Sequence, residues 1–374
     1  FMASDSAVAT AISNESSSSA GPSGESPREV LGGSPGVQPA ASAAPASETP
    51  SETEEARPAF ISIPPESILN GQKAPFDLYV IVGSKQVRVF KQGEALERDR
   101  FDRYLEKGDE SLMARVDSID GFFEAGIIEM LALATDSSNG PAVRARGVVR
   151  ALEFAGLDLF LFGFSKENLS MKVDRVHQIL QVALPLIQDD KTRPLLVAYR
   201  QEKMPTSVGT MVGATLVGGA LLHKMQSVPA PTFQAFLVAT YFRDISLFRN
   251  SIIERPAYDQ HPEASMRLLS NYPGVTEQFR LVIQQHHESS SGTGFPRGLR
   301  GLDIFRMAKI PLAAEKISEL LKVRDLSPQD EAAILEDIIS ERFSRDPGVQ
   351  PMAPMKELMR ECREAIKMKV VKFR

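Results

Sequence analysis

Residues 286–301 read HHESSSGTGFPRGLRG, an adjacent pair of histidines followed by a loop that contains four glycines and one proline. Glycines let a backbone approach a ligand closely, and the guanidinium groups of Arg297 and Arg300 suit a phosphate or a guanine edge. The stretch lacks the preceding strand, the following helix and the Lys-Ser/Thr pair of a nucleotide P-loop, which excludes that class of site. We therefore expect a ligand-binding loop that begins at two imidazoles.

The sequence before this pair predicts a helix that ends at the first imidazole. Phe279, Val282 or Ile283, and His286 recur at steps of three and four residues, so they share one face, and that face enters the core. His287 lies about 100° further round the helix. The two rings can therefore converge only on a site that lies between their directions.

A second apolar stripe leads to a carboxylate. Its members share one helical face: Phe233, Phe236, Leu237 and Thr240. The next position on that face is Asp244, and a buried carboxylate is unfavourable unless it is paired or binds metal. Together with His261 and the histidine pair it predicts a metal site. Two alternatives stay open at this point: Asp244 could pair with Arg243, and His261 could cap a helix or face solvent.

The string His-His-Glu, three residues, and Gly-x-Gly-Phe-Pro-Arg-Gly-Leu resembles the signature of the HD-GYP family, in which tyrosine normally stands at Phe295. The segments 261–263 and 306–310 extend the resemblance over roughly residues 200–325. It implies a five-helix HD core in which two or three iron-type metals activate hydroxide against cyclic di-GMP.

The resemblance is incomplete at the metal site. The family's His-Asp dyad falls on Arg243-Asp244, and arginine has no lone pair for a metal. Other family positions fall on residues that do not match: an upstream ligand near Gly209, a lysine on Leu247 and an aspartate on Ser291. The late aspartate falls on Glu315, which can still ligate.

The resemblance thus leaves five candidate metal ligands: Asp244, His261, His286, His287 and Glu315. Asp244 is also the candidate catalytic residue. Candidate ligand-binding residues are Arg243, Gly292, Gly294, Phe295, Pro296, Arg297 and Arg300. In this interpretation the Arg243 guanidinium replaces the charge of a lost metal and binds a phosphate together with the two loop arginines.

Three functions follow as hypotheses. The first is a degenerate HD-GYP signalling protein that binds cyclic di-GMP, a related nucleotide or a protein partner with impaired turnover. The second is an active phosphodiesterase with one or two divalent ions, iron or manganese. The third is a metal-free interaction module similar to the HDOD relatives. Efficient hydrolysis needs closely held groups, so the lost ligands favour the first.

Composition divides the chain into three parts. Residues 1–57 hold eight acids against two bases and few large apolar side chains, which predicts a disordered tail. Residues 58–118 predict a small α/β module, with a hairpin formed by residues 76–82 and 86–90 and a helical pattern over 94–107. Residues 119–374 predict an all-helical HD-type domain, so the expected fold class is mostly α.

The charge and the cysteine content limit the kinds of binding partner and the cellular compartment that we expect. The formal charge of −5 lies in the acidic tail, so the remainder is near neutral and contact with DNA is not expected. A single cysteine, Cys362, fits a reducing compartment. The longest apolar stretch, residues 211–222, is interrupted by glycine and too short for a membrane span. We therefore expect a soluble, cytoplasmic protein.

Overall fold

The computed structural model describes residues 60–63, 73–82, 85–97, 112–119, 121–189, 193–225, 227–249, 257–323, 327–344 and 351–367. The acidic tail of residues 1–57, the turn of the expected hairpin and most of the helical pattern over 94–107 lie outside these ranges. Pro58–Arg374 form one compact unit, and the change from sheet to helices expected near residue 118 falls inside it.

A small antiparallel sheet opens this unit. Its strands are β1 (Phe60–Ile63), β2 (Leu78–Val82), β3 (Lys85–Phe90) and β4 (Leu112–Arg115), in the order β1-β4-β2-β3. The predicted hairpin is confirmed by the antiparallel pairing of β2 with β3. Strand β4 was not anticipated, because four residues are too few to show alternation; it pairs with both β1 and β2.

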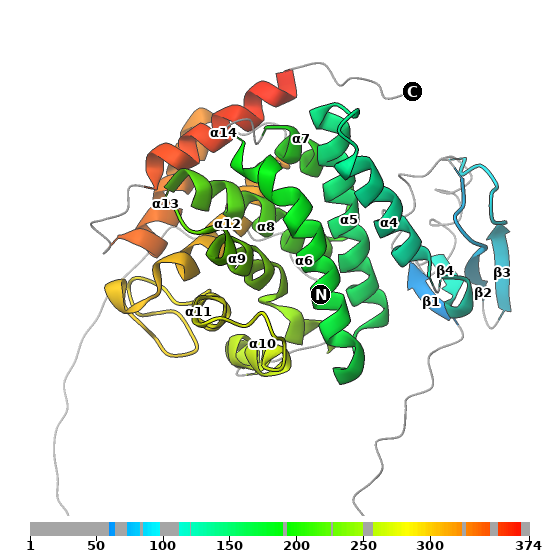
Figure 1. Cartoon of the computed structure of the whole chain (residues 1–374), viewed down its shortest axis with the longest axis horizontal. Helices are drawn as coiled ribbons and strands as arrows, with labels where there is room; N and C mark the ends of the chain where they lie inside the picture. Colours follow the sequence, from blue (N-terminus) through cyan, green and yellow to red (C-terminus); the bar gives the residue numbers. More distant parts are fainter. Residues whose placement is uncertain are drawn as a thin grey trace, which may run out of the picture. The chain divides into compact units, whose positions relative to one another are not determined.

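The sheet packs on the helical body through apolar side chains. Leu78, Leu112 and Ala114 are fully buried. The ring of Phe76 meets the ring of Phe122 edge to face at 5.3 Å, and a short helix, α3 (Val116–Ile119), leads from β4 toward α4. Figure 1 shows the strands gathered beside α4, at one side of the helices.

Helices make up the rest of the described chain. They are α4 (Phe122–Thr135), α5 (Pro141–Phe162), α6 (Lys166–Gln188), α7 (Arg193–Gln201), α8 (Thr206–Met225), α9 (Ala230–Phe242), α10 (His261–Leu269), α11 (Glu277–Gln285), α12 (Ile310–Leu320), α13 (Pro328–Phe343) and α14 (Met352–Lys367), with short 3-10 turns between some of them. Helices α5, α8 and α9 begin at a proline or directly after one, and no strand follows β4 in the described ranges. The mostly helical fold class is confirmed.

Helix α8 forms the centre of the core. By length and composition it could cross a membrane, but 78% of the window that meets this test is buried inside the protein. It packs against α9, α12 and α5. The apolar stretch at residues 211–222 is therefore the middle of a core helix.

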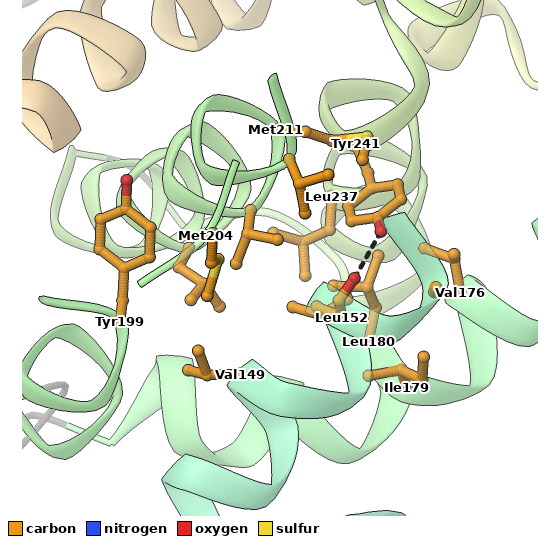
Figure 2. Packing of buried hydrophobic residues seen from close by; sticks show 14 of the residues in the cluster. Val149, Leu152, Val176, Ile179, Leu180, Tyr199, Met204, Met211, Leu237 and Tyr241 are labelled. Atoms are coloured by element: carbon orange, nitrogen blue, oxygen red, sulfur yellow. Dashed lines mark hydrogen bonds between the residues drawn. The ribbon is translucent and has the colours of Figure 1, made fainter. Parts of the chain in front are cut away.

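Helix α9 is anchored to the same core at the end that leads to the candidate site. Figure 2 shows Tyr241 reaching toward α5, where its hydroxyl donates to the carbonyl oxygen of Leu152 at 2.7 Å. Tyr241 is buried, and its neighbours in Figure 2 include Leu237 and Met211. This anchor holds the end of α9, and with it the two residues that follow, against the helical body.

Candidate metal centre

Asp244 is delivered by the apolar stripe of α9. The side chains of Phe233, Phe236, Leu237 and Thr240 are all buried, as the stripe predicts. The helix ends at Phe242, Arg243 stands at its C-cap, and Asp244 follows at once with its side chain 29% exposed. The carboxylate therefore lies at the edge of the core, where a ligand can reach it.

Two imidazoles are oriented by backbone carbonyls. His261 begins α10, and its Nδ1 donates to the carbonyl oxygen of Tyr258 at 2.7 Å. His286 stands at the C-cap of α11, and its Nδ1 donates to the carbonyl oxygen of Ile283 at 2.7 Å. A carbonyl oxygen can only accept, so each ring carries a proton on Nδ1 and turns its Nε2 toward the cluster.

These two Nε2 atoms lie against one oxygen of the Asp244 carboxylate. Oδ1 of Asp244 lies 3.0 Å from Nε2 of His261 and 3.2 Å from Nε2 of His286. The two Nε2 atoms lie 3.2 Å apart. Ligand atoms about 2.1 Å from one ion and at right angles to each other lie about 3.0 Å apart. The triangle therefore fits three ligands on one face of an octahedral ion.

The same triangle is unfavourable without a cation. Burial lowers the pKa of His286 below its ordinary value, so this ring stays neutral near pH 7. Burial alone would raise the pKa of Asp244, but the charge of Arg243 holds it well below its usual range, and the carboxylate is ionised. The two Nε2 atoms and the Asp244 oxygen crowd around one position, where a cation would attract all three. Two histidines and one carboxylate form a donor set typical of a divalent transition metal.

His287 and Phe295 close the group. The ligand atoms of Asp244, His261, His286 and His287 all lie within 4.8 Å of one another. The ring of Phe295 stacks on the ring of His287 at 4.4 Å, and burial lowers the pKa of His287 far below its ordinary value. Phe295 stands where the resemblance places tyrosine, and its ring forms one wall of the imidazole cluster.

Glu315 lies outside this group of four and pairs with Arg243. Its Oε2 accepts from Nη2 of Arg243 at 2.5 Å, while Nη1 of Arg243 donates to the carbonyl oxygen of Thr240 at 3.0 Å. Nε of Arg243 lies 3.1 Å from Oδ2 of Asp244. The side chain of Arg243 is 1% exposed. The structure therefore turns this guanidinium inward, toward two carboxylates, and the expected contact with a ligand phosphate stays a prediction.

The glycine loop is tied down by Glu288, a residue that the sequence did not single out. Its buried carboxylate accepts from the backbone nitrogens of Arg297 and Leu299, each at 2.8 Å. Gly294 is required by close packing, because a Cβ at that position would overlap the backbone of Ser289 and of His287. The loop thus folds back over the end of α11, and the histidine pair lies beneath it.

Arg342 of α13 is a second residue that sequence reasoning missed. Its side chain is 1% exposed, and its guanidinium donates to the carbonyl oxygens of His286 and Glu288. The hydroxyl of Ser290 donates to the carbonyl oxygen of Arg342 at 2.6 Å. A long-range contact of this kind leaves no local signal, since Arg342 sits among charged residues on an ordinary amphipathic helix.

The loop arginines differ in exposure and partners. Nη2 of Arg297 donates to Oε1 of Glu263 at 2.7 Å, and this guanidinium is 46% exposed. Arg300 is exposed, and its side chain packs against Gly292, which has a φ of 86°. Pro296, which precedes Arg297, is half-buried. The loop therefore offers two cations to solvent beside the imidazole cluster.

Three further positions depart from the family pattern: Gly209, Leu247 and Ser291. Nζ of Lys322 lies 3.0 Å from the place that a Cβ of residue 209 would take, so a lysine occupies the space beside Gly209. Leu247 is half-buried in a 3-10 turn. Ser291 exchanges hydrogen bonds with Ser289 and Thr293. None of these three positions supplies a carboxylate or an imidazole.

Comparison with known proteins concerns the domain and the fold. The family described as "HD domain" matches residues 251–330, a segment that includes three of the histidines and Glu315 but not Asp244. A solved structure, Bd1817, described as a HDG"Y"P protein from Bdellovibrio bacteriovorus, is similar with a TM-score of 0.59 and 15% identity, over 80% of this chain and 99% of that chain. No curated protein matches by sequence. At this identity the structural match concerns the fold.

Proposed function

This chain carries an HD domain and has the fold of an HD-GYP-type protein, and from this premise we propose that it is a degenerate signalling protein that binds cyclic di-GMP or a related nucleotide. One observation carries the proposal. Asp244, His261 and His286 bring one carboxylate oxygen and two ring nitrogens within 3.2 Å of one another, beside a glycine loop with two exposed cations. A divalent cation at that point would balance the negative charge of the carboxylate, and a phosphate beside it would balance the positive charges of the cation and the two arginines.

The residues of the triangle would hold a divalent metal, iron or manganese, with His287 as a further ligand. When bound, such an ion withdraws charge from a phosphate and lowers the pKa of a coordinated water. The backbone carbonyls of Tyr258 and Ile283 keep both Nε2 atoms free for the metal. The site fits a metal without rearrangement of these side chains.

The loop would supply the contacts to the nucleotide. Arg300 and Arg297 present guanidinium groups to solvent next to the cluster, and guanidinium matches a phosphate in charge and geometry. The partly exposed carboxylate of Asp244 marks the side from which a ligand approaches. A protein partner on the same side is compatible with this arrangement.

We expect Arg243 to impair the hydrolysis of a phosphodiester at this site. A guanidinium stands where the resemblance expects a ligating imidazole, and it holds Oδ2 of Asp244 and the carboxylate of Glu315 in ion pairs. Phosphodiester hydrolysis requires nucleophile and phosphate to be placed within a fraction of an ångström. We expect binding to survive this change and turnover to be reduced. The single cysteine and the burial of α8 favour a cytoplasmic location.

Metal content and cyclic di-GMP binding, measured on one anaerobic sample, test the proposal. We expect bound iron or manganese, a rise in Tm with cyclic di-GMP and slow hydrolysis, because a ligand of the folded state stabilises it. His286→Asn removes a ligand and should abolish the metal-dependent rise in Tm. His223→Gln, in the last turn of α8 and away from the cluster, is the matched control.

The outcomes separate the three hypotheses. Hydrolysis at ordinary enzymatic rates identifies an active phosphodiesterase and contradicts the proposed degeneracy. Absence of both metal and a cyclic di-GMP effect identifies an interaction module of the HDOD kind. Metal with a nucleotide-dependent rise in Tm and slow turnover supports the proposal.

A further inference from the structure

We propose that the centre holds a single metal ion and that Arg243 is the residue that keeps a second ion out. The inference rests on the proposed metal site and adds the number of ions and the residue that sets it. Arg243 is 1% exposed and lies between Asp244 and Glu315, whose side chains are 29% and 25% exposed. It is the cation that lies between the two carboxylates.

The two oxygens of Asp244 face different cations. Oδ1 belongs to the triangle with Nε2 of His261 and of His286. Oδ2 lies 3.1 Å from Nε of Arg243. A carboxylate that bridges two metals would place one metal at each oxygen, and here the second oxygen is already occupied by a guanidinium.

Glu315 provides the other carboxylate beside the place that a second metal ion would take. Its Oε2 lies 2.5 Å from Nη2 of Arg243, so one planar cation spans both carboxylates. Nη1 donates to the carbonyl oxygen of Thr240 at 3.0 Å and fixes the guanidinium from the helix side. A divalent ion between Oδ2 of Asp244 and Glu315 would have to displace this buried group, which has no lone pair to offer in return.

Charge favours one ion over two. The two carboxylates and the guanidinium between them carry a net charge of minus one. One divalent ion changes this to plus one. A second would place three uncompensated positive charges in a mostly buried site, where unpaired charge is strongly unfavourable.

Helix α8, which packs against α9 and α12, supplies no replacement ligand from its interior. Helix α8 contains no Asp, Glu or Cys, and its sole histidine, His223, stands in the last turn. Nζ of Lys322 fills the space beside Gly209 and lies over the ring of Tyr199 at 4.5 Å. Lys322 thus takes the space at Gly209, the position near which the resemblance expects a ligand.

The test is the number of ions per chain. The full chain is prepared anaerobically, loaded with Mn²⁺, freed of excess metal and measured by elemental analysis and by electron paramagnetic resonance. We expect about one Mn²⁺ per chain with the signal of an isolated ion. Arg243→His exchanges the cation for an imidazole and should bind about two ions with an exchange-coupled signal.

Two further variants separate charge from ligation. Arg243→Met removes the cation without adding a ligand and should show whether the loss of charge alone admits a second ion; we expect at most weak binding of one. Arg280→Met, which removes a surface arginine paired with Glu277, is the matched control and should bind one ion. Melting curves of the metal-free proteins report whether each variant is folded.

Two ions per wild-type chain, or one ion in a folded Arg243→His variant, overturn this inference and leave the proposed metal function standing. A wild-type chain that binds no metal contradicts the proposed function itself, and the inference with it. If Arg243→His does not fold, the stoichiometry and the signal of the wild type still decide the question.

Discussion

Nη2 of Arg342 lies 2.5 Å from the carbonyl oxygen of His286, although the two residues are 56 positions apart in the chain. The same guanidinium donates to the carbonyl oxygen of Glu288 and, at 3.4 Å, to those of Ala308 and Lys309. One buried cation from α13 thus satisfies carbonyl groups at the end of α11 and before α12. The position of the histidine pair therefore depends on Arg342, which is not one of the candidate metal ligands.

Substitution Arg342→Met tests this dependence. The variant keeps an apolar stem but leaves buried carbonyl groups without donors, and the free energy of unfolding should fall by about 3 kcal/mol. Metal affinity should fall as well, because the carbonyl of His286 is released. Urea unfolding and metal titration measure the two effects. Arg267→Met, at an exposed position of α10, is the control, and equal stability of the two variants would contradict the role assigned to Arg342.

Gly294→Ala tests the close packing of the loop. An added Cβ would overlap the backbone of Ser289 and His287, and backbone cannot move aside as a flexible side chain can. We expect a loss of about 2 kcal/mol in the free energy of unfolding and weaker metal binding. Gly140→Ala is the matched control, because nothing lies within 4 Å of a Cβ there. A Gly294→Ala variant with wild-type Tm would show that the loop adopts another path.

Glu288→Gln tests the carboxylate that holds the loop. An amide can accept from only one of the backbone nitrogens of Arg297 and Leu299 and turns a donor toward the other, a loss of about 2 kcal/mol for a buried group. Trypsin should then cleave faster after Arg297 and Arg300, since the loop opens more often. The rate of cleavage is read by mass spectrometry. Glu277→Gln, at the surface, should not change it.

The buried carboxyl of Glu153 should make the free energy of unfolding depend on pH. Burial raises the pKa of this carboxyl from 4.5 to about 7, although Arg150 opposes the shift, and its Oε1 has no hydrogen-bond partner. The folded state then binds more protons than the unfolded state between these two values, so stability falls as pH rises through this window. The loss amounts to at most about 3 kcal/mol.

The variant Glu153→Gln removes this titration. Its stability relative to the wild type should therefore increase between pH 5 and pH 8, as measured by urea unfolding at several pH values. Glu129→Gln, on the exposed face of α4, should show a constant difference from the wild type. A constant difference for Glu153→Gln as well would place the pKa of Glu153 near its ordinary value.

The local sequence pattern was sufficient to predict the helical architecture and much of the candidate site. The apolar stripes of α9 and α11 predicted that Asp244 and His286 follow buried faces, and both residues stand at the helix ends with the expected faces in the core. Such periodicity is readable because burial of one face repeats every turn. The hairpin was readable for the same reason, whereas β4 was too short to show its period.

Contacts between distant segments could be decided only by tertiary packing. The sequence left open a pairing of Asp244 with Arg243 but could not say that the same guanidinium would turn inward and pair with Glu315 as well. Nor could it identify Arg342, which reaches the carbonyl oxygen of His286 from the end of α13. Periodicity reports which face of a helix is buried, but the partner of a buried charge depends on which other helix end packs beside it.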